Sequence, residues 1–139
     1  MEHALMALER HITRRWRELP QDAGMALSYG EYDYLQTLAE LGSVRLSDLA
    51  LEMRVSKPTA SSMVKRLQAK GLLQRNACPE DGRASLLSLS ESGRTLLNRD
   101  GETYARFVGE LLAGLTEPEH QQLATLLQRM VQQSQSGQR

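Results

Sequence analysis

The sequence is short of aromatic side chains and of cysteine. Only 4% of its 139 residues are aromatic, and the single cysteine, Cys78, has no partner for an intrachain disulfide. No apolar run reaches the roughly 18 residues of a membrane-spanning helix. The first residues lack the basic and apolar regions of a signal peptide. We therefore expect a cytoplasmic protein with no membrane partner.

Motifs of common catalytic and metal sites are also missing. The chain has no Gly-x-Ser-x-Gly, no glycine-rich phosphate loop, no His-Glu-x-x-His and no Cys-x-x-Cys. Residues 62–65 have the Ser-x-x-Lys spacing of an acylating serine, which we interpret as a coincidence of a hydroxylated, basic helix face. His3, His11 and His120 lie far apart in the sequence and show no ligand spacing. We predict neither an enzyme, nor a metal site, nor a bound cofactor.

Acidic residues are absent from one long segment. The chain is neutral overall, with 17 basic and 17 acidic residues, yet no Asp or Glu lies between Met53 and Pro79. The basic residues in this segment are Arg54, Lys57, Lys65, Arg66, Lys70 and Arg75. Phosphate is a common reason for such a local excess, because each basic contact releases a condensed counterion. A solvated basic face is the alternative.

The same segment has the pattern of two short helices joined by a tight turn. Leu46, Leu49, Ala50 and Met53 recur at the spacing of an amphipathic helix. Ser56 is a suitable N-cap for a second helix, and proline is tolerated in a first turn. The pattern predicts a helix-turn-helix. Its candidate DNA-binding residues, on the small, hydroxylated and basic outer face and its flanks, are Ser56, Lys57, Pro58, Thr59, Ser61, Ser62, Lys65 and Arg66.

A β-hairpin is expected after the second helix. Gly71 ends that helix, and residues 72–75 and 85–89 are predicted strands whose connecting loop contains turn residues. This loop, or wing, places Arg83 at the end of a projecting arm, with Asp81 as its support. A long cation on a narrow arm suits the electronegative minor groove at A·T-rich steps. A salt bridge from Arg83 to Asp81 or Glu80 is the alternative.

The assembled pattern resembles the MarR family of bacterial transcription regulators. The resemblance rests on residues 49–52, 55–59, 64–67 and 70–72, and then on 81–83, 87–90 and Gly93. It implies a mainly α fold with a small β wing, in a single domain over residues 1–139. Within it, a winged helix-turn-helix core spans about 28–90, and dimerisation helices span about 4–19 and 91–133.

The resemblance also implies a function. Family members are homodimers that bind pseudo-palindromic operators in double-stranded DNA and usually repress. By position, the helix from Ser56 enters the major groove and Arg83 the minor groove. Many relatives carry longer polar or basic residues where this chain has Ser61 and Ser62. We therefore expect little direct base readout here, with more weight on Lys65, Arg66 and DNA shape.

The terminal segments carry apolar stripes that a small winged core cannot cover. The stripes comprise Leu5, Leu8, Ile12, Trp16 and Leu19, then Leu97, Gly101, Tyr104, Val108, Leu111 and Leu115, and then Leu123, Leu126, Leu127, Met130 and Val131. Between the last two stripes, residues 116–119 have the pattern of a capping box. A two-fold homodimer would cover the stripes, and a helical cap on a monomer is the alternative. Two recognition helices would then reach major grooves about 34 Å apart, so the operator should be an inverted repeat.

The regulatory signal is less constrained by the sequence. The family resemblance implies an effector cleft for small aromatic acids or phenols, with Arg15, Trp16, Met25, Tyr29 and Tyr32 as candidates. The alternative is that these residues pack the core or the dimer. Cys78, expected to be exposed near Arg75 and Arg83, is a candidate redox thiol. A winged helix that docks proteins is a further alternative, which a weak salt dependence of binding would identify.

Overall fold

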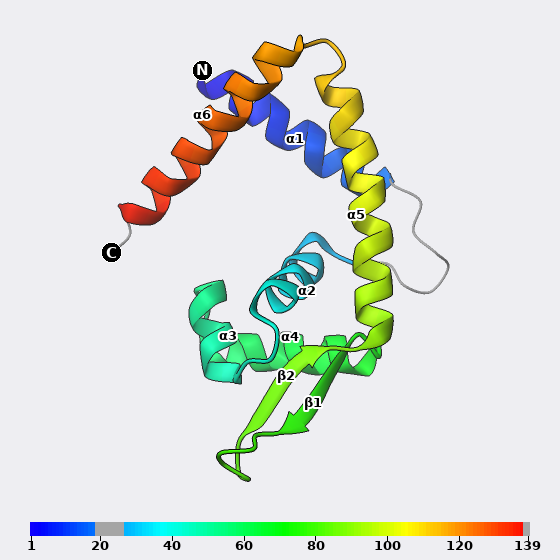
Figure 1. Ribbon diagram of the computed structural model, residues 1–139, viewed down its shortest axis with the longest axis vertical. Coiled ribbons are helices and arrows are strands. Elements are labelled where there is room, and N and C mark those ends of the chain that lie inside the picture. Colours follow the sequence, from blue (N-terminus) through cyan, green and yellow to red (C-terminus); the bar gives the residue numbers. More distant parts are fainter. Residues whose placement is uncertain (19–26, 138–139) are drawn as a thin grey trace. The chain divides into compact units, whose positions relative to one another are not determined.

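The computed structural model describes residues 1–18 and 27–137 (Figure 1). Six helices and two strands lie in these ranges, which confirms the prediction of a mainly α fold with a small β wing. The elements are α1 (Glu2–Glu18), α2 (Tyr29–Leu41), α3 (Leu46–Met53), α4 (Lys57–Ala69), β1 (Leu73–Ala77), β2 (Ser85–Leu89), α5 (Glu91–Leu112) and α6 (Glu117–Ser136). The chain packs as two compact units, residues 1–100 and 101–139, whose boundary lies inside α5.

The core of the first unit explains how α4 is held. The fully buried large side chains come from α2, α3, α4, β2 and the residue before β1, and they are Leu35, Leu38, Leu49, Val64, Leu67, Leu72 and Leu87. Ala60, Val64 and Leu67 lie on one side of α4, as the 3.6-residue period predicts. The opposite side of α4 is therefore turned to solvent.

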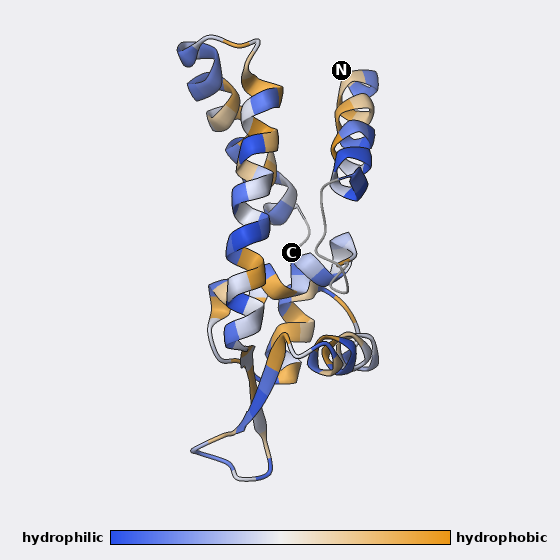
Figure 2. Ribbon diagram, turned by 90° about the vertical axis from the view of Figure 1, so that its right-hand side faces the viewer, coloured by the Kyte–Doolittle hydropathy of each residue, from blue (hydrophilic) through white to orange (hydrophobic). Residues whose placement is uncertain are grey.

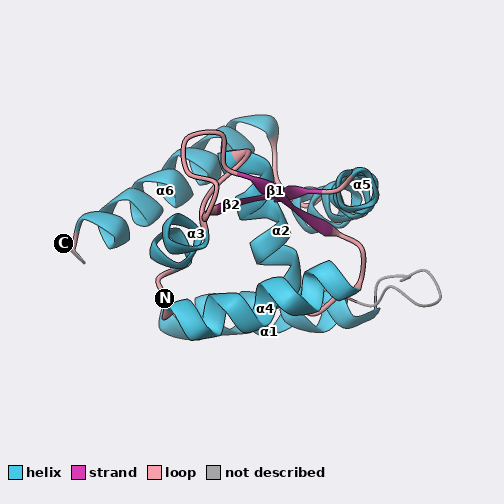
Figure 3. Ribbon diagram, turned by 90° about the horizontal axis from the view of Figure 1, so that it is seen from below, coloured by secondary structure: helices cyan, strands magenta, loops and turns pink. Residues whose placement is uncertain are grey.

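The hairpin is held by more than its own ladder. β1 and β2 pair antiparallel from Leu73–Leu89 to Ala77–Ser85, and they are the strands drawn in magenta in Figure 3. Val44, in the connection between α2 and α3, also bridges β2. Its N–H donates to the Leu87 carbonyl at 3.0 Å, and the Leu87 N–H donates back at 2.7 Å. The wing is thus fastened to the segment that leads into α3.

Helix ends follow local capping chemistry. Ser28 Oγ accepts from the Glu31 N–H at 3.1 Å at the start of α2, and Gly42 ends that helix with φ of 80°. The backbone N–H of Thr116 donates to Glu119 Oε2 at 2.8 Å, as the capping box predicts. The polar residues after Gln132 do not end α6, which continues to Ser136 rather than 133, because glutamine is a good helix former.

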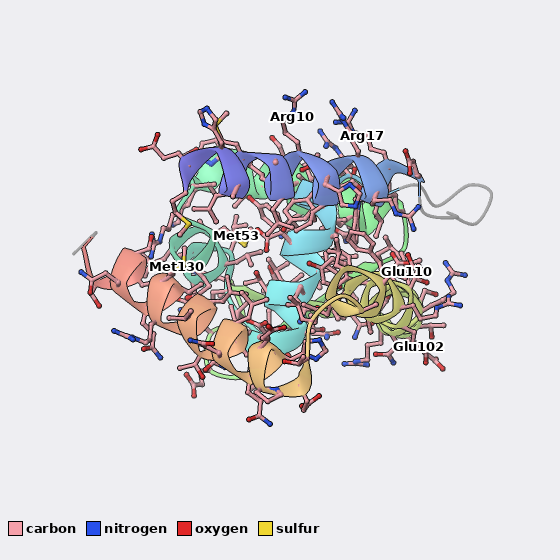
Figure 4. All side chains as sticks on the ribbon, turned by 90° about the horizontal axis from the view of Figure 1, so that it is seen from above. Arg10, Arg17, Met53, Glu102, Glu110 and Met130 are labelled. Atoms are coloured by element: carbon pink, nitrogen blue, oxygen red, sulfur yellow. The ribbon has the colours of Figure 1, made fainter. Side chains whose placement is uncertain are left out.

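The long helices leave apolar side chains uncovered in the single chain. Figure 2 shows α1, which bears the N label, with hydrophobic residues along one side and hydrophilic residues along the other. Arg10 and Arg17 project from the same side of α1 in Figure 4. The exposed large hydrophobic residues of α1 and α6 are Leu5, Met6, Leu8, Leu126, Leu127, Met130 and Val131. The last residue of the predicted α1 stripe, Leu19, lies outside the described residues.

Candidate nucleic-acid interface

The turn between α3 and α4 is short and locally encoded. Arg54 adopts the left-handed conformation with φ of 56°, and the Val55 N–H donates to the Ala50 carbonyl at 3.0 Å. Ser56 then caps α4, since its Oγ accepts from the Thr59 N–H at 3.3 Å. Pro58 lies in the first turn, where its missing N–H removes no helical hydrogen bond. The structure therefore contains the predicted helix-turn-helix.

The outer side of α4 gathers most of the predicted DNA-binding residues. Ser62 and Lys65 are exposed and Ser61 is partly buried, while Ala60 and Val64 behind them are fully buried. The exposed start of the helix is formed by Ser56, Lys57, Pro58 and Thr59. Small side chains allow this surface to approach another molecule closely. Hydroxyl groups and the Lys65 ammonium then supply hydrogen-bond donors.

Arg66, by contrast, is engaged with α2. Its Nη1 lies 3.9 Å from Oε1 of Glu31, a carboxylate whose side chain is 7% exposed. Lys70 donates to Oε2 of the same carboxylate at 2.5 Å. The charge pattern of the sequence does not reveal this pairing, because Glu31 lies outside the acid-free segment and 39 residues before Lys70. Base or phosphate contact by Arg66 stays a prediction, and it competes with this ion pair.

The wing loop is organised by Asp81. Its Oδ1 accepts from the Arg83 N–H at 3.0 Å, and its backbone carbonyl accepts from the Ala84 N–H at 3.0 Å. The carboxylate thus binds the backbone of Arg83, and within the described part of the chain no salt bridge joins Arg83 to Asp81 or Glu80. Arg83 is exposed, on a loop that is largely hydrophilic in Figure 2. Its guanidinium is free to extend from the hairpin.

Cys78 differs from the prediction. Cys78 is 7% exposed, so it is buried, and the Nη2 of Arg45 donates to its Sγ at 3.7 Å. Arg75 instead donates to Gln68 and Ser85. Burial follows from the wing loop folding back, since the Cys78 N–H donates to the Ala84 carbonyl. A cavity of about 290 Å³ adjoins the thiol and is lined by Ser43, Val44, Arg45, Asp48, Cys78, Pro79, Glu80 and Leu86.

The surroundings of Cys78 favour its thiolate. The backbone N–H groups of Glu80 and Asp81, and then the Arg45 guanidinium, lower the pKa of the thiol, while burial acts in the opposite direction. The predicted exposure of Cys78, on which the redox hypothesis depends, is wrong, because the residue is buried. A cation does lie beside the thiol, but it is Arg45 rather than Arg75 or Arg83. Redox activity of Cys78 stays a prediction.

Three of the five effector-cleft candidates lie together. The ring centroid of Trp16 is 4.7 Å from that of Tyr32 and 5.8 Å from that of Tyr29, both in edge-on geometry. Trp16 is buried, whereas Tyr29 is 61% exposed. Arg15 Nη1 lies 3.5 Å from Glu18 Oε2, so its guanidinium already has a carboxylate partner. Met25 lies outside the described residues.

Other chemistry is sparse in the described ranges. No group of three or more His, Cys, Asp or Glu side chains lies close enough there to hold a metal ion. The His120 ring hydrogen-bonds the Leu112 carbonyl at 2.8 Å within the second unit, where it joins α6 to the end of α5. None of the helices in these ranges has both the length and the apolar character that crossing a bilayer requires.

A helix pair with a solvent-facing second helix beside an arginine-bearing hairpin is the DNA-binding unit of winged helix-turn-helix transcription regulators, and this chain is one of them. The sequence model of the MarR family matches residues 27–85. The HTH-type transcriptional regulator YxaD of Bacillus subtilis is 32% identical over 104 residues, which cover 75% of this chain and 73% of that protein. The chain belongs to the MarR family.

Solved structures have the same fold over nearly the whole chain. FabT of Streptococcus pneumoniae, in complex with DNA, has a TM-score of 0.84 at 18% identity, covering 97% of this chain and 95% of FabT. PcaV of Streptomyces coelicolor, in complex with its natural ligand, has a TM-score of 0.71 at 24% identity, covering 94% and 91%. At these identities the likeness concerns the fold.

Proposed function

We propose that the protein is a homodimeric repressor that binds an inverted-repeat operator and releases it when a small aromatic effector binds. The observation that carries this proposal is the outer side of α4, where Ser62 and Lys65 are exposed over a fully buried apolar stripe. An α-helix of this kind fits the major groove of B-DNA. The likeness of the fold to FabT, which binds DNA, supports the same use of this surface.

Two grooves are read by two kinds of contact. Lys65 reaches the phosphates or base edges of the major groove, while Ser61 and Ser62 let the helix approach closely. Arg83 enters the flanking minor groove, where a narrow A·T-rich segment concentrates negative potential. Asp81 keeps the arm in position through its hydrogen bond to the Arg83 backbone.

The dimer is supported by the uncovered apolar side chains of α1 and α6. Met130 and Val131 are 51% and 55% exposed in the single chain, and Leu126 and Leu127 of the same stripe are also exposed. Several large apolar side chains on one helix are a typical protein interface, because burying them removes apolar surface from water. A second copy would bury these stripes and set the distance between the two recognition helices.

An effector acts by changing the distance between the two recognition helices of the dimer. The cluster of Trp16, Tyr29 and Tyr32 provides apolar ring surfaces with phenolic hydroxyls, which suits a small aromatic molecule. PcaV, which has the same fold, binds a natural ligand. A ligand that prefers a dimer with the wrong spacing lowers DNA affinity by its differential affinity for the two forms.

The test begins with DNA fragments that the purified protein selects from genomic DNA. Lys65→Ala should weaken binding to the selected duplex about tenfold. It should also make the negative slope of log affinity against log salt shallower by about one. The control Arg129→Ala removes the same charge from exposed α6 and should bind as the wild type does. Unchanged affinity of the Lys65 variant would contradict the docking of α4 in the major groove.

The oligomeric state is tested separately by sedimentation. The wild-type protein should be a dimer, and Met130→Glu, which places a charge in the α6 stripe, should shift it toward the monomer. A wild-type protein that sediments as a monomer at micromolar concentration would contradict the homodimer. If Met130→Glu loses DNA binding as well as the dimer, the two-fold arrangement is needed for operator recognition.

A further inference from the structure

Glu31 is a buried charge that DNA contact does not use. Among the residues that the structure describes, it is the only charged side chain that is buried, at 5% exposure. It lies in the first turn of α2, where its N–H is capped by Ser28. Both of its carboxylate oxygens face α4, with Lys70 on one and Arg66 on the other. A buried carboxylate requires such partners, because its desolvation is otherwise uncompensated.

The pairing places Arg66 of α4, and Lys70 just after its end, on a different side of the helix from Lys65. Arg66 follows Lys65 by one residue and Lys70 follows it by five, so they lie about 100° and about 140° around the helix from Lys65. Met63 marks the same side, since its Cε lies 4.0 Å from the position of a Cβ built on Gly30 in α2. Lys65 thus faces outward, while Arg66 and Lys70 face the first turn of α2.

The paired cations nevertheless remain within reach of solvent. The side chains of Arg66 and Lys70 are 57% and 31% exposed, whereas that of Glu31 is 7% exposed. Rotation of their long, flexible side chains would bring either cation to a phosphate beside the helix. Such contacts add affinity for any DNA sequence, because phosphates carry no sequence information.

We propose that Glu31 is a specificity-determining positioning residue that holds Arg66 and Lys70 away from the DNA backbone. The inference rests on the proposed docking of α4 in the major groove. The buried carboxylate competes with the phosphates for both cations, and salt screens this partly buried pair less than it screens contacts in water. Affinity then depends more on the face that contains Lys65, and less on sequence-independent attraction.

Neutralising the carboxylate provides the first test. Glu31→Gln should make the slope of log affinity against log salt steeper by about 0.9 for each released cation that reaches a phosphate. If the variant and the wild type bind a scrambled duplex equally at 1 M salt, the variant should bind it about eightfold more tightly at 0.1 M salt for each added phosphate contact. The ratio of affinities for the selected and scrambled duplexes should fall accordingly.

Glu40→Gln is the matched control. It removes the same charge from an exposed position on the same helix, where Glu40 accepts only a 3.4 Å hydrogen bond from Gln36 in the described structure. Its salt slope should equal that of the wild type. An equal change in the two variants would assign the effect to net charge and overturn the proposal, as would an unchanged slope in Glu31→Gln.

Lys70→Gln tests the inference without relying on the stability of the Glu31 variant. If Glu31 keeps Lys70 away from the phosphates, this substitution should leave the salt slope of the otherwise wild-type protein unchanged. A slope that becomes shallower by about 0.9 would overturn the proposal. In the Glu31→Gln background the same substitution should remove one contact. Normal weakening by Lys65→Ala combined with no effect of Glu31→Gln would refute this inference and leave the proposed function standing.

Discussion

Replacing Gly93 by alanine tests how closely the start of α5 packs against the segment that follows the recognition helix. A Cβ added at Gly93 would lie 2.2 Å from the Leu72 carbonyl oxygen and 3.1 Å from its carbonyl carbon. The same carbonyl accepts from the Ser90 N–H at 3.1 Å, and Ser90 Oγ donates to the Gly71 carbonyl at 2.6 Å. Relief of the clash must therefore move backbone rather than a flexible side chain.

The expected cost combines opposing terms. Overpacking of this kind costs about 1–3 kcal/mol, and weakening one hydrogen bond at the junction adds about 1 kcal/mol. Alanine also favours the helix over glycine by about 0.5–1 kcal/mol. We expect Gly93→Ala to lower the free energy of unfolding by about 2 kcal/mol. The clash therefore outweighs the helix propensity of alanine.

Urea unfolding followed by circular dichroism measures this difference, with all proteins at one concentration because the stability of the proposed dimer would depend on concentration. Gly109→Ala is the control on the same helix, since its added Cβ meets no atom of the described residues within 4 Å beyond its own stretch of helix. It should raise stability by about 0.5–1 kcal/mol. Equal stabilities for the two variants would refute the close packing of α5 on the Leu72 backbone.

Three further predictions concern capping, the wing and the thiol. Ser56→Ala should lower the free energy of unfolding by about 1 kcal/mol, measured in urea, because the N-cap of α4 is lost. Arg83→Ala should weaken operator binding by about 1–3 kcal/mol, with a smaller loss when G·C pairs flank the site; equal, negligible losses on all sequences would exclude minor-groove insertion. Arg45→Ala should raise the pKa of Cys78, seen as thiolate absorbance at higher pH. Because folding lowers this pKa, stability should rise with pH between the native and unfolded pKa values, and Cys78→Ala should lack that rise.

Local patterns were sufficient to predict the helix-turn-helix. The spacing of Ala60, Val64 and Leu67 identifies the buried side of α4, and Ser56 identifies its first turn. Gly71, which follows the C-cap residue Lys70, has a φ of 73°, the left-handed conformation that glycine favours at the end of a helix. These features depend on residues within a few positions of one another, so a single sequence contains them.

Contacts between distant segments could not be predicted in the same way. Glu31 pairs with Lys70 across 39 residues, and Arg45 reaches Cys78 across 33. A charge pattern shows which cations are present but not which carboxylate lies against them in the fold. Charge alone therefore predicts the same role for Arg66 as for Lys65, whereas the structure turns Arg66 toward α2. The burial of Cys78 likewise depends on the path of the loop.

The two hydrogen bonds between Val44 and Leu87 join the β-hairpin to the helix-turn-helix within one chain. The hairpin is thereby joined by backbone hydrogen bonds to the residues that lead into α3, the first helix of the helix-turn-helix. A change in the angle between two such lobes would withdraw major-groove and minor-groove contacts together rather than one at a time. In the proposed homodimer, each half of the operator would then lose both kinds of contact in the same step.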